Sequence, residues 1–191
     1  MITKALIVGG ITVTCCMLAN AEGMNGYVGG GLGVTKLNVD CAGTTSCDDG
    51  GNGGKVFGGY HFTPEWAVEL SYFDFGEAEF TVPIGGSPVS GSLDTSAIGI
   101  GAAYHAKLAT DWSFTGRLGI ARVKTEATAG YRGLTASLSE NKVKPYFGLA
   151  VGYSMTPGFE LQAGWDFSNS ADIAGESGAV HLLSVGLSFA F

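Results

Sequence analysis

The sequence has little charge, little proline and no long apolar run, and each shortage excludes a class of protein. Asp, Glu, Lys and Arg make up 14% of the 191 residues, which is low for a soluble protein. No apolar run approaches the roughly 18 residues that a membrane-spanning helix needs. Proline occurs only 5 times, which argues against a disordered low-complexity chain. A membrane β-barrel fits all three shortages, because its apolar residues alternate with polar ones.

The start of the chain has the pattern of a secretory signal peptide. Lys4 precedes an apolar stretch at positions 5–18, and an Ala-Asn-Ala cleavage motif follows at positions 19–21. We therefore expect residues 1–21 to be removed and one domain to span residues 22–191. The alternative is an N-terminal membrane anchor, for which the apolar stretch is short.

Cysteine is also scarce, and the expected export of the protein determines which cysteines remain and in which redox environment they lie. Cys15 and Cys16 fall within the expected signal, and neither follows the motif that lipidation usually requires. Cys41 and Cys47 remain in the mature chain. An oxidising compartment favours a disulfide between cysteines this close. The alternative is a metal site, which needs more ligands than two cysteines. The neighbouring Asp48 and Asp49 carboxylates prefer different metals from those that thiolates prefer.

The charge balance is acidic. Removing Lys4 leaves 9 basic residues against 17 acidic ones, a formal charge of −8. Because nucleic-acid phosphates demand a basic surface, we expect no nucleic-acid partner.

Period-two alternation predicts strands with two unlike faces. In the last segment, bulky apolar residues at odd positions 183–191 alternate with mostly small residues. The face opposite the bulky one carries Glu69, Arg117, Gln162 and Asp166 together with many glycines. A soluble ligand-binding barrel would place its large apolar residues inside, so this polarity is inverted. We predict an all-β fold, an eight-stranded antiparallel up-and-down transmembrane barrel.

Eight segments of about ten residues have this alternation, each long enough to cross a bilayer when tilted. We predict strands at residues 26–36, 55–62, 66–75, 95–106, 112–124, 142–154, 159–167 and 181–191.

Long and short connections alternate between these segments. Short turns at 63–66, 109–112 and 156–159 recur 46 and 47 residues apart, which indicates a repeated strand–loop–strand hairpin. The long connections, expected as surface loops, are residues 38–54, 76–94, 125–141 and 168–178. Pro83 and Pro88 are expected to prevent strand formation in the second loop.

Aromatic residues lie beside the short turns on the apolar face. Rings at the membrane–water boundary are typical of transmembrane barrels. The predicted lipid-interface aromatics are Tyr60, Trp66, Tyr104, Trp112, Tyr153, Phe159 and Trp165.

Several motifs together resemble the OmpA-type eight-stranded outer-membrane barrel family. They include Tyr27-Val-Gly-Gly-Gly-Leu-Gly33, Phe57-Gly-Gly-Tyr-His-Phe-Thr-Pro64, Val68-Glu-Leu-Ser-Tyr72, Arg117-Leu-Gly119, Tyr153-Ser-Met-Thr-Pro157 and Leu187-Ser-Phe-Ala-Phe191.

The resemblance implies a place in the outer membrane of a Gram-negative bacterium, with lipid and lipopolysaccharide around the barrel. It implies that Phe189 and Phe191 form a signal for the outer-membrane assembly machinery. The resemblance covers the barrel but not the soluble peptidoglycan-binding domain that family members often add. We therefore expect no role in attaching the membrane to peptidoglycan.

The family also implies charged residues in the lumen that block or gate a narrow pore. Glu69 and Arg117 match two such positions, and we predict that they pair across the lumen. Gly31, Ala103, Gly152 and Gln162 stand where other charges would be, so we expect most of the network to be lost. We expect four aromatic residues to point into the lumen and occlude it: Tyr27, Phe57, Phe73 and Tyr146.

No residue pattern indicates catalysis, a cofactor or a metal. Lipid-modifying barrels need a Ser/His/acid set, but His181 and Ser184 fall on opposite strand faces, with Glu176 nearby. His61 and His105 both face the lumen near the periplasmic mouth, and without an evident third ligand we interpret them as lumen polarity.

The leading functional hypothesis is therefore a non-catalytic surface-display protein whose loops contact a host surface ligand. The alternatives are a small passive pore and a lipid A-modifying enzyme. The loops carry eight acidic residues that would meet solvent, divalent cations or basic partner surfaces: Asp40, Asp48, Asp49, Glu77, Glu79, Asp94, Asp172 and Glu176. Arg122 and Lys124 are expected near the outer rim, within reach of lipopolysaccharide phosphates.

Overall fold

The computed structural model describes residues 25–37, 46–48, 50–84, 87–131, 134–169 and 178–191. All its regular elements are strands. They are Gly26–Leu37 (β1), Ser46–Asp48 (β2), Gly50–His61 (β3), Trp66–Ile84 (β4), Ser87–Lys107 (β5), Trp112–Tyr131 (β6), Leu134–Thr156 (β7), Phe159–Asn169 (β8) and Ala179–Ala190 (β9). Within these ranges no helix is long and apolar enough to cross a membrane.

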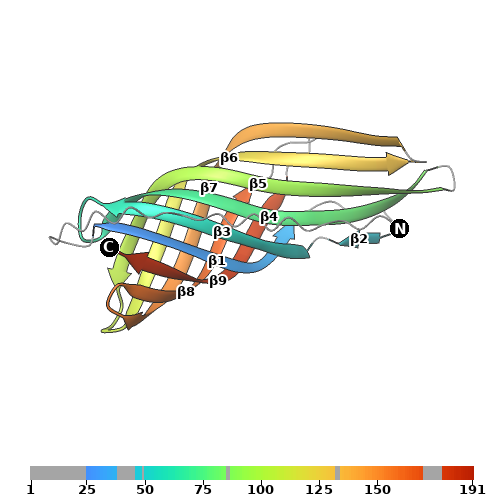
Figure 1. Cartoon of the computed structure of the whole chain (residues 1–191). Coiled ribbons are helices and arrows are strands. Elements are labelled where there is room, and N and C mark those ends of the chain that lie inside the picture. The colour runs from blue at the N-terminus through green and yellow to red at the C-terminus, as the bar shows by residue number, and fades with distance from the viewer. Residues whose placement is uncertain (1–24, 38–45, 49, 85–86, 132–133, 170–177) are drawn as a thin grey trace, which may run out of the picture.

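Eight of the strands close into one antiparallel barrel (Figure 1). The order around it is β1, β3, β4, β5, β6, β7, β8 and β9, and β9 pairs back onto β1. The short β2 pairs only with the outer part of β4. Closure leaves no sheet edge along the wall, so every backbone group there has a partner in an apolar surrounding. The predicted fold class is confirmed.

The final strand closes the barrel along its whole length. β9 pairs with β1 from Tyr27 opposite Ala190 to Leu37 opposite Val180. At the end of the chain, Gly26 and Phe191 exchange backbone hydrogen bonds of 3.0 and 2.8 Å. Small residues let these strands approach, since a Cβ at Gly33 would overlap the carbonyl oxygen of Leu183.

The two faces of the wall have the inverted polarity that the alternation predicts. Outward apolar residues are exposed, up to 80% for Leu32. The inward face holds polar side chains and rings, and the four predicted occluding aromatics are all buried there. This arrangement suits a barrel surrounded by lipid rather than by water.

Two predicted surface loops are instead long hairpins, and this corrects the sequence analysis. β4 and β5 continue to Ile84 and Ser87, with Pro83 opposite Pro88. Two prolines facing each other are compatible with a non-hydrogen-bonded pair, in which neither residue donates across the ladder. A bulge between Asp74 and Glu77, with Gly76 at φ 72°, redirects β4 where the hairpin begins.

The second correction concerns residues 125–141. β6 and β7 pair from Trp112 opposite Tyr153 up to Tyr131 opposite Leu134, so nearly all of the expected loop is strand. Strand β3 likewise begins at Gly50, inside the expected first loop. The β4–β5 and β6–β7 hairpins project together beyond the other strands, at the right of Figure 1. Residues 38–45 and 170–177 lie outside the described part of the chain.

Candidate functional site

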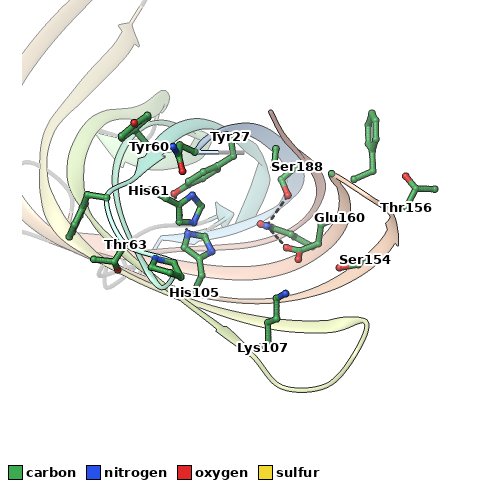
Figure 2. Close-up of a pocket in the computed structure, with 17 residues that line it drawn as sticks. Tyr27, Tyr60, His61, Thr63, His105, Lys107, Ser154, Thr156, Glu160 and Ser188 are labelled. Carbon is green, nitrogen blue, oxygen red and sulfur yellow. Dashed lines mark hydrogen bonds between the residues drawn. The ribbon is translucent and has the colours of Figure 1, made fainter. Parts of the chain in front are cut away.

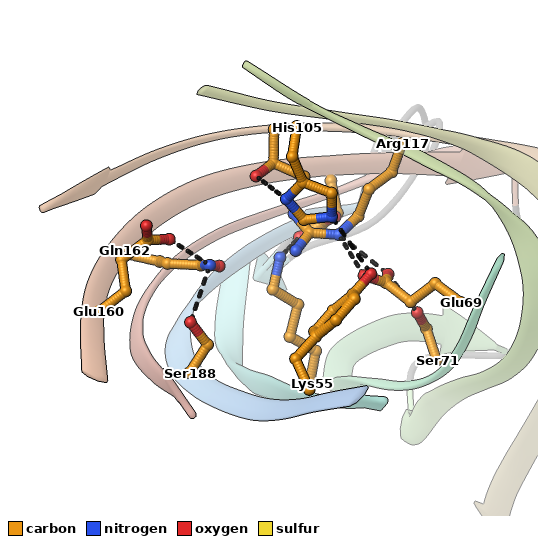
Figure 3. Close-up of polar contacts among 11 residues, drawn as sticks. Lys55, Glu69, Ser71, His105, Arg117, Glu160, Gln162 and Ser188 are labelled. Carbon is orange, nitrogen blue, oxygen red and sulfur yellow. Dashed lines mark hydrogen bonds and ion pairs between the residues drawn. The ribbon is translucent and has the colours of Figure 1, made fainter. Parts of the chain in front are cut away.

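A charge cluster fills the middle of the lumen. Arg117 Nε donates to both carboxylate oxygens of Glu69, at 2.9 and 3.1 Å. Tyr27 and Ser71 each donate a hydroxyl hydrogen bond of 2.9 Å to the same carboxylate. Figure 3 shows Arg117 and Ser71 directed toward Glu69. Both charged residues are at most 2% exposed. The structure thus brings the two sequence-predicted residues together as a buried, multiply hydrogen-bonded ion pair.

A second buried ion pair was missed by the sequence analysis. Lys55 Nζ donates to Asp166 Oδ2 at 2.5 Å, from β3 to β8 across the lumen. The network is therefore less depleted than expected. One signal was available, because period two places Lys55 on the same face as Phe57 and His61.

The two pairs are neighbours in the lumen. Gly148 lies between Arg117 on β6 and Asp166 on β8, since it is directly opposite both in the strand register. The Arg117 guanidinium lies 4.7 Å from the centroid of the Phe57 ring, a cation–π contact. Its two Nη atoms have no hydrogen-bond acceptor among the described residues.

The outer end of the lumen is closed by a cluster of buried, mostly apolar side chains, here called the outer plug. Its members share nearly complete burial and mutual contact, and they are Phe73, Phe75, Ala97, Ala121, Val123, Tyr146, Val180 and Leu182. The rings of Phe73 and Phe75 stack at 5.7 Å, and Tyr146 packs on Phe73 at 5.5 Å.

The periplasmic end is open and polar, and is here called the mouth. It holds a cavity of about 870 Å³ whose lining includes Tyr27, His61, His105, Glu160 and Gln162 (Figure 2). Gln162 donates to Glu160 at 2.7 Å and to Ser188 at 3.1 Å. The cavity ends at Tyr27, whose hydroxyl binds the central carboxylate.

The predicted interface aromatics all face outward and are exposed. Two pairs form beside the periplasmic turns: Trp66 with Tyr104 at 4.9 Å, and Trp112 with Tyr153 at 5.2 Å. Trp165 differs, because it stacks on His181 at 5.8 Å toward the outer end of β8. The rings thus mark both edges of the apolar wall.

Charged residues replace apolar ones on the outward face where the wall ends. Arg122 and Lys124 follow Ile120 on β6, and both are exposed. Lys124 donates to Glu126 at 2.9 Å, and this bond with the nearby carboxylate raises the pKa of Lys124. Both residues therefore lie at the outer rim, and their contact with lipid phosphates stays a prediction.

Acidic residues gather on the neighbouring strands at the same level. Asp94 lies opposite Glu77 on β4 and opposite Glu126 on β6. Partial burial, and then the charges of Asp74 and Glu77, raise the pKa of the Asp94 carboxyl. This outer rim is therefore a band of closely spaced charges rather than an isolated ion pair.

The structure does not bring the remaining catalytic candidates, His181 and Ser184, together. Ser184 is buried and faces the lumen, whereas His181 lies on the outward face against Trp165 and Phe167. Among the described residues, no three His, Cys, Asp or Glu side chains cluster to hold a metal.

Other candidates lie outside the described residues or lack a described side chain. The candidates outside the described residues are Asp40, Cys41, Asp49, Asp172 and Glu176. The candidates whose side chains are not described are Cys47, Asp48 and Glu79. The Cys41–Cys47 disulfide stays a prediction, as does the assembly role of Phe189 and Phe191.

Comparison with known proteins agrees with this geometry. The model of the outer membrane protein beta-barrel domain matches residues 7–191. No curated protein matches the sequence.

Three solved structures of similar fold are distant in sequence. Neisserial surface protein A is 15% identical, with a TM-score of 0.61, over 87% of this chain and 97% of that one. OprG from Pseudomonas aeruginosa is 12% identical, with a TM-score of 0.56, over 87% and 96%. Ail of Yersinia pestis, solved with the heparin analogue sucrose octasulfate, is 16% identical, with a TM-score of 0.55, over 87% and 100%.

Proposed function

Because the chain belongs to the outer membrane protein beta-barrel domain family, and so lies in the outer membrane of Gram-negative bacteria, we propose that it is a non-catalytic surface-display protein. Its β4–β5 and β6–β7 hairpins are the binding elements, and their partner is a host surface ligand. The observation that carries this proposal is the length of these strands, which run 19 to 23 residues. About ten residues suffice to cross a bilayer, so half of each strand extends beyond it.

The chemistry of the hairpins supports a polar ligand. On the β6–β7 hairpin, Arg122, Lys124 and Lys142 are exposed. Sulfate and phosphate groups are the ligands that such cations bind best. A sulfated polysaccharide is therefore the first ligand to test, and the heparin analogue seen with Ail supports the choice.

Shortening the hairpins tests the proposal. Residues 79–92 and 128–137 would each be replaced by an Asn-Gly turn, which suits a two-residue hairpin connection. Bacteria expressing this variant, which also carries Arg122→Gln, Lys124→Gln and Lys142→Gln so that the exposed cations are removed, should insert a heat-modifiable barrel but bind immobilised heparin and cultured epithelial cells roughly tenfold less. Shortening one hairpin at a time provides the matched control. Unchanged binding by the doubly shortened barrel would refute the display proposal.

The outer rim is also proposed to contact lipopolysaccharide. Arg122 and Lys124 stand where the apolar wall ends, which is where lipid phosphates lie. The passive-pore alternative has no comparable support, because the outer plug and the central ion pairs fill the described lumen. The enzyme alternative has none either, since His181 and Ser184 face opposite sides of the wall.

A further inference from the structure

Two histidines from different strands meet at the mouth. His61 ends β3 and His105 is near the end of β5, and both strands flank β4. Their imidazole centroids are 4.7 Å apart, with an angle of 50° between the ring planes. Figure 2 shows the two rings side by side, directed into the cavity. Two imidazole rings from different strands thus meet at one point of the wall of this open cavity.

Hydrogen bonding fixes the orientation of His105. Its Nδ1 lies 3.1 Å from Thr115 Oγ1, on the residue directly opposite in the strand register. Its Nε2 lies 3.3 Å from the Tyr27 hydroxyl, which already donates its proton to Glu69. Both hydroxyl groups can donate or accept, so the two contacts allow either tautomer of His105. In the tautomer whose Nδ1–H donates to Thr115, the Nε2 lone pair is left to bind a ligand. A ligating histidine commonly has this form, with its other nitrogen held by an outer partner.

His61 provides the second nitrogen. Its Nδ1 is buried and has no hydrogen-bond partner among the described residues. A buried, unpaired polar atom costs on the order of 1–3 kcal/mol unless something satisfies it. A cation held between the two rings would satisfy this atom and the Nε2 lone pair of His105 together.

We propose that His61 and His105 form a periplasm-facing site for one transition-metal ion that prefers imidazole ligands, such as Cu²⁺, Ni²⁺ or Zn²⁺. Imidazole suits these ions, whereas Ca²⁺ and Mg²⁺ prefer oxygen ligands. Water in the cavity completes the coordination shell. The proposal does not depend on the surface-display function, because the hairpins lie at the other end of the barrel.

The chain offers an internal control for this site. It contains three histidines, and the third, His181, lies on the outer face of the wall against Trp165. His61→Gln, His105→Gln and the double variant are compared with His181→Gln. All are made without an affinity tag and with Cys41→Ser and Cys47→Ser, so that thiols bind no metal. Heat-modifiable gel migration selects the folded barrels.

Cu²⁺ is the probe, because it binds nitrogen ligands most tightly in the divalent series. The parent barrel and His181→Gln should each bind one equivalent in detergent, and their electron paramagnetic resonance spectra should show coupling to two imidazole nitrogens. Each single mouth variant should weaken binding roughly tenfold or more and show one coupled nitrogen. The spectrum of the parent barrel tests the site even if a variant fails to fold. Coupling to no imidazole or to one, or equal binding by the double variant, would overturn the proposal.

Discussion

The two ends of the lumen are built by the same strands but have opposite character. The outer plug is apolar and closed, with Phe73 and Leu182 at most 2% exposed. The mouth is polar and open, with a cavity of about 870 Å³. Between them lie the Glu69–Arg117 and Lys55–Asp166 ion pairs.

The difference follows from side-chain size on one continuous inward face. At the plug, aromatic rings pack in one cluster with alanines at positions 97 and 121, so the narrow interior fills. At the mouth, the small side chains of Ser188 and Ala190 on β9 leave room, and His61, His105 and Glu160 line the space without closing it. A barrel of fixed strand number can therefore be sealed at one end and accessible at the other.

Breaking the central pair should have the largest effect. Arg117→Met leaves the Glu69 carboxylate buried without its cation, and the expected loss is about 3–5 kcal/mol of unfolding free energy. Urea titration in lipid vesicles, followed by the fluorescence of the three tryptophans, measures it. The double variant Glu69→Leu, Arg117→Met removes both charges and should recover most of the loss. An equally unstable double variant would mean that packing, not charge pairing, holds this level of the lumen.

Matched truncations at the two ends should have unequal effects. Phe73→Ala opens a dry cavity in the outer plug and should cost about 3 kcal/mol. Gln162→Ala removes two hydrogen bonds beside the water-filled mouth, where water replaces them, and should cost about 1 kcal/mol. Both are measured by the same urea titration. Equal losses would contradict the contrast between a sealed end and an open one.

The fold was largely predictable from the sequence. Strands with bulky apolar residues on one face and polar residues on the other, repeated along the chain, fit few folds other than a membrane barrel. The β4–β5 hairpin was not predicted, because Pro83 and Pro88 argue against a strand unless the two prolines face each other. Only the register reveals that they do.

The site was predictable in part. Glu69 and Arg117 stand out as charges on inward positions of strand-like segments. The Lys55–Asp166 pair joins residues 111 positions apart, and their meeting depends on the register around the whole barrel. Leu182 and Val180 of the plug were not named as buried residues. The alternation places Leu182 on the inward face, but its apolar side chain does not fit the expectation of a polar lumen, and Val180 lies outside the predicted strand at 181–191.

The smallest expected effect lies across the wall from the outer plug, where Asp94 faces the aqueous rim. Burial and the neighbouring Asp74 and Glu77 raise its pKa in the folded protein, so the ionised carboxyl destabilises the fold at neutral pH. Asp94→Asn should therefore raise the unfolding free energy, by less than about 0.5 kcal/mol at this exposed position. The gain should shrink as the pH falls through the raised pKa toward the ordinary aspartate value of about 3.9, because Asp94 then becomes protonated in the folded state and no longer repels its neighbours. Urea titrations at pH 7 and near pH 4 measure the change. A gain that grows on acidification would mean that Asp94 makes a favourable contact rather than a repulsive one.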